Sequence, residues 1–261
     1  MFSNFRACPG GRRMNAYLTL TKYKGSQKKS DLLKQIDNPD GKSAFFEQAI
    51  LDFGNYWGTK NVSWYKQRYA AYEGHIKSSS DTNTSFFLKS SFPLIIGQGN
   101  PSILETHLTL HPIYGIPYLP GSLIKGVTAH YCHQVLGKED SKFKQGEEYA
   151  LVLFGSQEQA GAIHYHDALP TPKSIKNCLS LDVITPHHQS YNQGLNQAPR
   201  DDDSPVPVPF LTVKADFRVI LSCEDLAYAE WLNIAQKIVS HAVTEMGIGG
   251  KTNAGYGKME V

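Results

Sequence analysis

Residues 210–221, FLTVKADFRVIL, alternate apolar and polar side chains along their whole length. A period of two is typical of a β-strand that packs one face on a core and leaves the other face open. Ser222 and Asp225 follow at once and predict the start of a helix that extends to about Met246. The apolar set is Leu211, Val213, Ala215, Phe217, Val219 and Leu221, and the polar set is Thr212, Lys214, Asp216 and Arg218.

The other patterned segments predict a mixed fold. Residues 30–73 read as helical, and 117–137 read as a turn that leads into a helix. Strands are expected at 84–96, 162–170, 179–188 and in the last six residues. Two helices among four or more strands indicate an α+β fold with a ferredoxin-like βαββαβ core and one sheet face free of helices. A helical insertion precedes this core, and residues 189–209 form a long polar loop excursion.

Bulk composition sets few limits on function. The formal net charge is +2, so no global charge points to nucleic acid. Residues 1–30 are nevertheless basic and carry no acid, which predicts an arm that is either disordered or ordered by an acidic partner. The basic residues are Arg6, Arg12, Arg13, Lys22, Lys24, Lys28 and Lys29. The four cysteines are widely spaced, which argues against structural zinc. No apolar run reaches the roughly 18 residues of a membrane span, so a cytoplasmic protein is expected.

The segment GIGGKTNAGYG, residues 247–257, holds five glycines and one lysine. Amide groups beside a lysine and Thr252 are suited to binding phosphate. A nucleotide-binding P-loop is excluded, because Glu245 stands where that motif needs glycine and a helix precedes the loop. The alternative is a helix end followed by a turn, which explains Gly247 well and the other glycines poorly.

A second candidate anion site is the expected helix start at 120–126, where Gly121 and Ser122 precede Lys125. Together with Lys214, Arg218 and Lys251, this lysine could border a groove that follows a phosphate backbone. Tyr191 and Tyr256 could add surfaces on which bases stack. The alternative for each cation is a solvated, charged surface.

The histidines offer a competing hypothesis. His164 and His166 lie on one face of an expected strand, as metal ligands or acid–base groups require. His187 and His188 follow at the end of the next strand, and Asp167 and Asp182 are near in sequence. The sequence supplies no third ligand, so open-face histidines that only form hydrogen bonds remain the alternative.

Several motifs together resemble the RAMP superfamily of CRISPR RNA-binding proteins, and within it the small terminal (cap) subunit of the type III-B (Cmr) effector complex. The resemblance extends over roughly residues 84–261. The segments that carry it are YGIPYLPGSLIKG (114–126), GAIHYHDALP (161–170), LDVITPHHQSYN (181–192), SPVPVPFLTV (204–213) and GIGGKTNAGYG (247–257).

The resemblance implies a ferredoxin-like (RRM-like) RAMP domain at 84–261, after a basic arm at 1–30 and a helical extension at 31–83. It implies a non-catalytic subunit, without cofactor or metal, that caps a filament near the 3′ part of the guide RNA and helps hold the guide–target duplex. Its partners would be guide RNA, target RNA and neighbouring RAMP subunits. The implied RNA contacts are Gly121, Ser122, Lys125, Gly249, Gly250, Lys251 and Thr252. The alternative is a metal-independent endoribonuclease of the same superfamily that uses a histidine as general acid or base.

Overall fold

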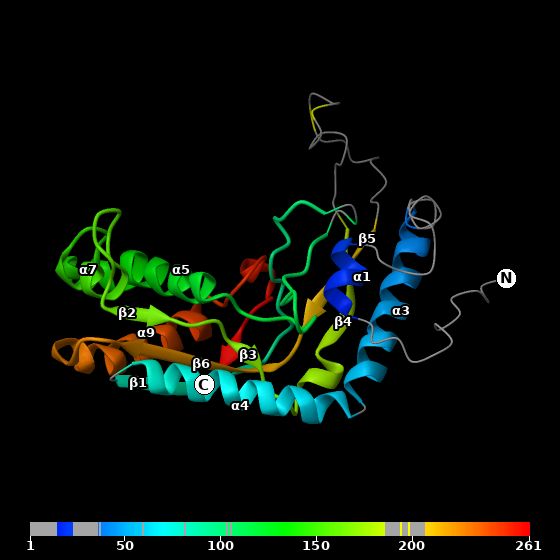
Figure 1. Ribbon diagram of the computed structural model, residues 1–261. Helices are drawn as coiled ribbons and strands as arrows, with labels where there is room; N and C mark the ends of the chain where they lie inside the picture. Colours follow the sequence, from blue (N-terminus) through cyan, green and yellow to red (C-terminus); the bar gives the residue numbers. More distant parts are fainter. Residues whose placement is uncertain are drawn as a thin grey trace.

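The computed structural model describes residues 15–22, 36, 38–58, 60–80, 82–102, 104, 106–185, 194, 198 and 207–261. Helices and antiparallel strands are combined, which confirms the predicted mixed fold (Figure 1). In the part of the chain that the structure describes, none of the helices has the length and apolar character needed to span a bilayer.

A five-stranded antiparallel sheet forms the centre of the molecule. Its order is β2-β6-β1-β7, and β3 also pairs with β6. The longest pairing joins β1 to β6, from Thr82 opposite Cys223 to Lys89 opposite Asp216. The strands are β1 (Thr82–Ser90), β2 (Ile163–Tyr165), β3 (Leu169–Pro170), β6 (Asp216–Cys223) and β7 (Met259–Glu260).

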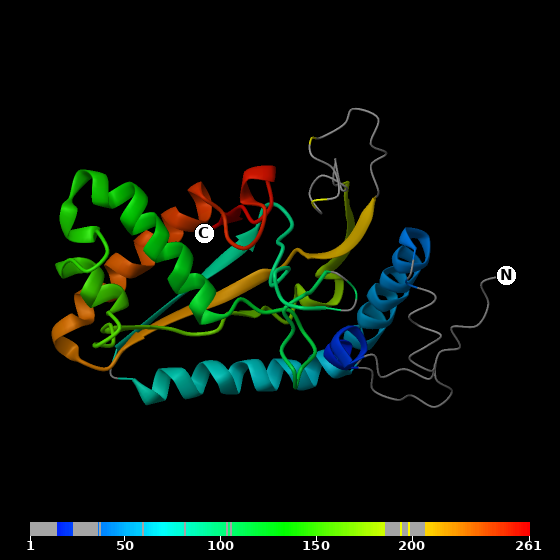
Figure 2. The same ribbon diagram turned by 90° about the horizontal axis from the view of Figure 1, so that it is seen from above.

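Helices α5 (Gly121–Tyr131) and α9 (Ala229–Glu245) lie side by side over one face of this sheet (Figures 1 and 2). The β6 side chains Phe217, Val219 and Leu221 are fully buried beneath them. After α5 come the π-helical turn η1 (Cys132–Leu136), α6 (Gly137–Glu139), η2 (Ser141–Phe143) and α7 (Glu148–Phe154). The turn η4 (Leu226–Tyr228) precedes α9, and η5 (Thr252–Ala254) precedes β7.

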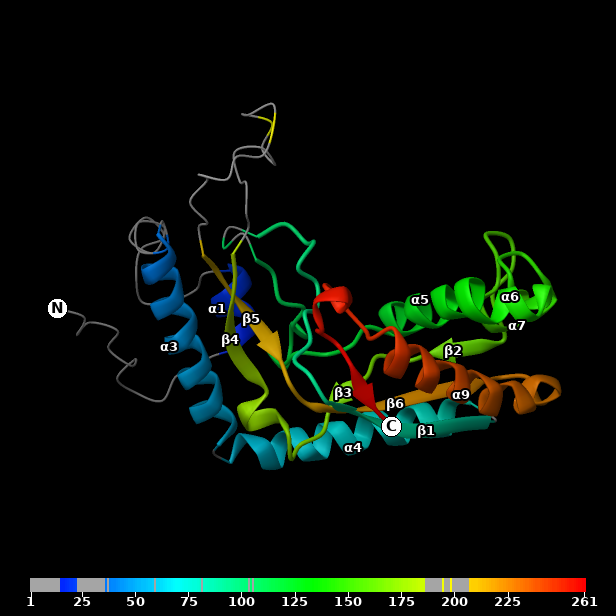
Figure 3. The ribbon, with the colours of Figure 1, turned by 180° about the vertical axis from the view of Figure 1, so that it is seen from behind.

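The opposite face of the sheet is covered by α4 (Asn61–Ser79), which runs along it in every view (Figures 1 to 3). Two tyrosine hydroxyls join the helix to the segment around β3. Tyr65 donates to the Pro170 carbonyl at 2.6 Å, and Tyr72 donates to the Asp167 carbonyl at 2.9 Å. The expectation of a helix-free sheet face is therefore wrong. It failed because a helix that precedes the core in sequence folds back beneath it.

The run 210–221 is not one strand. It divides into β5 (Val208–Val213) and β6, and β5 pairs with β4 (Leu179–Ile184) in a separate two-stranded sheet. At the break, the Lys214 amide donates to the Cys178 carbonyl at 2.8 Å and the Ala215 amide to Ser90 Oγ at 3.1 Å. Thr212, expected on an open face, is buried and donates to the Ser180 carbonyl.

Helices α1 (Ala16–Lys22) and α3 (Pro39–Trp57) pack beside the two-stranded sheet. Ala16 and Leu20 are buried in the same hydrophobic core as the central sheet. Part of the expected basic arm is thus a helix that packs on its own chain rather than a disordered tail. Lys22 is the last residue of α1, and the other basic residues of the arm lie outside the described residues. The short turn η3 (Ile175–Asn177) precedes β4.

Candidate nucleic-acid interface

The glycine-rich segment begins where α9 ends, and turn geometry explains most of its composition. Four of its glycines have a positive φ, a region that side-chain-bearing residues rarely adopt. Gly247 follows Met246, the C-cap residue of α9, as predicted for a glycine that ends a helix. These four are Gly247 (φ +80), Gly249 (+97), Gly255 (+93) and Gly257 (+74).

Close packing explains the remaining glycine. The Gly250 amide donates to the Ile95 carbonyl at 2.8 Å, and a Cβ on Gly250 would come within 3.3 Å of the Ile95 side chain. A Cβ on Gly249 would clash with the same carbonyl, and one on Gly257 would clash with the carbonyl of Ile248. The expectation that a turn explains only Gly247 is wrong, because the loop packs tightly on the segment that follows β1.

Lys251 has no such explanation. Among the described residues it is the only non-glycine with positive φ (φ 55, ψ 36). Its side chain is exposed and has no ion-pair partner in the described part of the chain. A left-handed backbone costs an L-residue about 1–2 kcal/mol. Such strain gathers at functional sites, where the surrounding structure enforces it.

An open groove of about 450 Å³ lies beside this lysine. It brings together residues from both motifs that the sequence singles out as anion sites, since Leu123 of α5 faces the glycine loop across it. A third wall, the loop after β1, was not singled out, although its glycine pair in GQGN is a visible turn signal. The lining residues are Ile95, Gly97, Gln98, Gly99, Leu123, Gly249, Gly250 and Lys251. Thr252 follows directly and opens η5.

The start of α5 is less open to an anion than predicted. The Gly121 amide donates to Asp167 Oδ1 at 2.7 Å, so a carboxylate already occupies this end of the helix. Gly121 itself is buried, and a Cβ there would clash with the Tyr165 carbonyl. Ser122 is exposed next to the groove-lining Leu123. Of this motif, the Ser122 hydroxyl is thus the polar group best placed to reach a ligand.

Lys125 does not line the groove. It is half-buried on α5, two positions beyond Leu123. Residues two apart on a helix point about 200° away from each other, so Lys125 lies on the other side of α5. The two predicted anion motifs adjoin, but their lysines do not converge.

The two cations expected on an open strand have other surroundings. Lys214 is exposed in the link between β5 and β6, away from any sheet face. Arg218 lies under α4, where its Nε is 3.1 Å from Glu73 Oε1 and its Nη2 donates to Ser85 Oγ at 3.0 Å. Its guanidinium also lies 5.2 Å from the centre of the Phe87 ring. A guanidinium with these three neighbours is not presented to an external phosphate.

Tyr256, one of the two aromatic residues expected to stack on bases, is not free either. Tyr256 donates to Asp182 Oδ2 at 2.8 Å and ties the glycine loop to β4. Burial, and then this carboxylate, raise the pKa of Tyr256 to about 12. Tyr191 and nearly all of the 189–209 loop lie outside the described residues.

The histidine hypothesis gains no metal site. His166 Nε2 is 2.7 Å from Ser222 Oγ, and His164 Nε2 is 3.9 Å from Glu224 Oε1. Burial, and then the neighbouring His164, lower the pKa of His166. Within the described ranges, no three His, Cys, Asp or Glu side chains gather in a geometry that could hold a metal ion. His187 and His188 fall outside those ranges.

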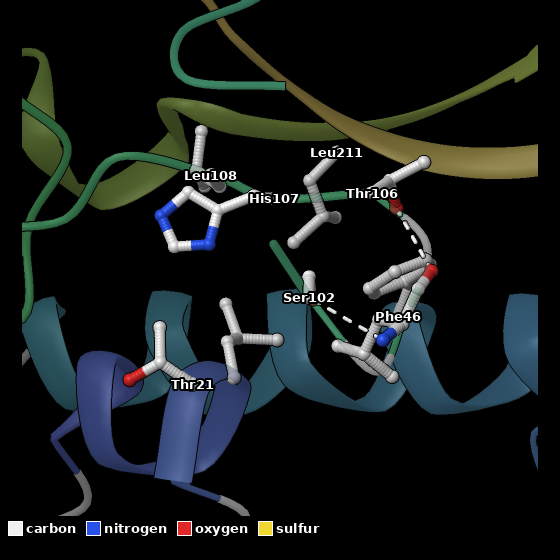
Figure 4. Close-up of a pocket in the computed structure, with 9 residues that line it drawn as sticks. Thr21, Phe46, Ser102, Thr106, His107, Leu108 and Leu211 are labelled. Atoms are coloured by element: carbon white, nitrogen blue, oxygen red, sulfur yellow. Dashed lines mark hydrogen bonds between the residues drawn. The ribbon is translucent and has the colours of Figure 1, made fainter. Parts of the chain in front are cut away.

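A second, smaller cavity lies between α1, α3, β5 and the segment that contains Ser102 and Leu108 (Figure 4). His107, Thr21 and Phe46 line it, and burial lowers the pKa of His107. At about 10 Å³ it has room for one water molecule at most. The groove beside Lys251 is therefore the candidate site.

Comparisons with known proteins agree with the motifs. A family model, the RAMP superfamily, matches residues 88–260. The chain is 28% identical over 250 residues to the CRISPR system Cmr subunit Cmr6 of Pyrococcus furiosus, covering 75% of this chain and 72% of that protein. It is 30% identical over 164 residues to Cmr6 of Saccharolobus solfataricus, covering 61% and 50%.

A solved structure shows the same fold. A chain in the cryo-EM structure of the type III-B Cmr-beta complex bound to cognate target RNA superposes with a TM-score of 0.58 at 24% identity. The match covers 74% of this chain and 63% of that one. The chain thus spans about half of the Saccharolobus protein and under two thirds of the chain in the complex.

Proposed function

Because the chain belongs to the RAMP superfamily, we propose that it is an RNA-binding, non-catalytic subunit of a type III-B (Cmr) CRISPR effector complex. Its position would be the end of the filament, near the 3′ part of the guide RNA, where it helps hold the guide–target duplex. The observation that carries the proposal is Lys251, an exposed lysine held in a left-handed conformation at the rim of an open groove.

The groove offers chemistry that suits one nucleotide of an RNA strand. Lys251 supplies a cation for the phosphate, and the exposed Ser122 hydroxyl lies next to the opposite wall. Ile95 and Leu123 provide apolar surface for a base or ribose, and the Gln98 amide can donate to or accept from a base edge. The Gly250 amide already donates to the Ile95 carbonyl, so this amide would not bind the phosphate and Lys251 would supply the charge.

The finer fold assignment belongs to the same proposal. The chain order β1-α5-β2-β6-α9-β7 and the spatial order β2-β6-β1-β7 support a ferredoxin-like core. We propose residues 84–261 as this RAMP domain, 31–83 as a helical extension and 1–30 as a basic arm. The proposed partners are guide RNA, target RNA and neighbouring RAMP subunits, and the proposed location is the cytoplasm.

Reconstituting the complex with guide RNA and the other Cmr subunits tests the role of Lys251. Lys251→Ala should weaken cross-linking of this subunit to RNA and reduce the salt dependence of binding by about one unit of slope. Lys237→Ala is the matched control, because Lys237 is an exposed lysine of α9 outside the groove. Equal cross-linking by wild type and Lys251→Ala would contradict the proposal.

The non-catalytic part needs a separate assay. Purified protein incubated with CRISPR repeat RNA should leave it intact, with or without divalent ions. Site-specific cleavage that disappears in His164→Ala or His187→Ala would establish the endoribonuclease alternative instead.

A further inference from the structure

The charged residues exposed on the outward face of α4 are all basic. Lys66, Arg68 and Lys77 are exposed on it, and Lys60 is exposed at its N-terminal cap. None of the four has an ion-pair partner among the residues that the structure describes. Glu73, the acidic residue of α4, points to the sheet and pairs with Arg218, with 16% of its side chain exposed. The one carboxylate of α4 thus pairs with the sheet, whereas the basic side chains of the helix face solvent.

The cations form two edges along the helix. At about 100° per residue, Lys60 and Arg68 lie near one edge, whereas Lys66 and Lys77 lie together on the other. The rise of the helix separates Lys60 from Arg68 by about 12 Å and Lys66 from Lys77 by about 16 Å. Small exposed residues and one glutamine form the surface between the edges: Ser63, Gln67, Ala70, Ala71, Gly74 and Ser78.

An exposed tryptophan interrupts the first edge. Trp64 is 39% exposed, although its ring contacts Tyr114 edge-on at 5.6 Å. The Arg68 guanidinium lies 5.9 Å from the centre of the Trp64 ring. An aromatic ring set between cations is the arrangement on which unpaired bases stack while the backbone follows the positive charge.

We propose that this face of α4, defined by Lys60, Trp64, Lys66, Arg68 and Lys77, is a second RNA-binding surface that takes single-stranded RNA. It lies on the opposite side of the central sheet from α5 and α9, and therefore away from the groove beside Lys251 (Figures 2 and 3). It also precedes the part of the chain that the family model matches. The surface suits a polyanion by its charge. The exposed ring favours unpaired bases over an acidic protein or a duplex, neither of which offers a free base to stack.

The test uses the full chain and a fluorescein-labelled oligouridylate of about 12 nucleotides. The triple variant Lys66→Ala, Arg68→Ala, Lys77→Ala keeps good helix formers on α4 and should fold normally. It should bind the probe more weakly and lose about two units of salt slope, since each phosphate contact on a single strand contributes about 0.7. The control triple, Lys138→Ala, Lys173→Ala, Lys237→Ala, removes equal charge from exposed positions elsewhere and should retain the slope.

Tryptophan emission gives a local readout. The oligouridylate should quench the wild-type protein, and Trp64→Phe should lose most of that quenching, because Trp57 is buried and Trp231 half-buried. Repeating the α4 triple in a Lys251→Ala background separates the two sites, since losses at distant sites add. An α4 triple that binds like its control, quenching that survives in Trp64→Phe, or displacement of RNA by an equal charge of polyglutamate would each overturn the proposal.

Discussion

Gly249 and Gly255 form a natural pair for testing what holds the glycine loop in place. Their φ angles are almost equal, +97 and +93. They differ in their surroundings: a Cβ on Gly249 would clash with the Ile95 carbonyl, whereas a Cβ on Gly255 would meet nothing within 4 Å. Substitution of each by alanine therefore imposes the same backbone strain but a different packing cost.

The cost at each position can be worked from this geometry. Alanine in the left-handed region costs about 1–2 kcal/mol, which is the whole expected effect of Gly255→Ala. Gly249→Ala must also push the loop away from Ile95. This movement breaks the Gly250–Ile95 hydrogen bond of 2.8 Å, worth about 1 kcal/mol, and overpacks a buried contact at about 1–3 kcal/mol. We expect the free energy of unfolding of Gly249→Ala to fall by about 2–4 kcal/mol more than that of Gly255→Ala.

Urea denaturation followed by tryptophan fluorescence measures the difference, provided both variants unfold with the wild-type m-value. Gly249→Ala should also weaken RNA binding in the assembled complex, because displacing the loop moves Lys251. Equal losses of stability in the two variants would refute the reasoning, since they would show that the loop does not depend on its packing against Ile95.

Three further outcomes follow from single contacts. Lys251→Gly should raise the free energy of unfolding by about 0.5–1 kcal/mol through relief of its left-handed strain, whereas Lys251→Ala should leave it unchanged; thermal melting distinguishes them. Glu73→Ala should lower the free energy of unfolding by about 2 kcal/mol. This loss is smaller than for a fully buried ion pair because Arg218 keeps its hydrogen bond to Ser85, and adding Arg218→Met should recover part of it. Burial lowers the pKa of His111, whose Nδ1 accepts two backbone amide bonds. The stabilisation that neutral His111 contributes is therefore present above the ordinary pKa of 6.5 and is lost as the pH falls through the lower folded value. His111→Asn should make the free energy of unfolding, measured by urea titration, depend less on pH between about 7 and 5.

Local patterns were sufficient to predict the long helix α9. The apolar stripe of α9 predicts its buried face correctly at Leu232, Ile238 and Val239. The glycine loop and the start of α5 were each expected to lie near a ligand; residues of both line one groove, and binding there stays a prediction. The helix prediction succeeds because it depends on helix periodicity and on helix-end signals, which are properties of short segments.

The division of residues 210–221 into two strands could not be predicted from alternation. The apolar set keeps its period of two through the break, so the pattern is the same for one strand or two. Hydrogen bonds from Lys214 to Cys178 and from Ala215 to Ser90 decide where the chain leaves one sheet for the other. Both partners are distant in sequence, and no local signal identifies them.

The position of α4 on the sheet could not be predicted from the sequence for a related reason. Tyr65, Tyr69 and Tyr72 recur at helical spacing and pack on the core, as a buried helix face requires. This spacing does not show which surface the helix covers, because the hydroxyls of Tyr65 and Tyr72 bond to carbonyl groups far away in the sequence. Covering the sheet removes Arg218 from solvent and leaves the outer side of α4 as the charged surface. The exposed cations on this side of the sheet thus belong to α4, whereas Arg218 of the strand beneath it is largely covered.

The glycine content of the loop at 247–257 has two possible physical explanations. Glycines in a phosphate cradle and glycines in a tightly packed turn leave the same sequence pattern, and here all five satisfy turn geometry or packing on neighbouring backbone. The lysine differs, because a packed turn gains nothing from a strained, exposed cation with no ion-pair partner in the described structure. If packing alone had shaped the loop, glycine at position 251 would serve it better. Retaining a lysine there is consistent with an anionic ligand, and this makes Lys251 rather than the glycines the residue on which the RNA-binding proposal depends.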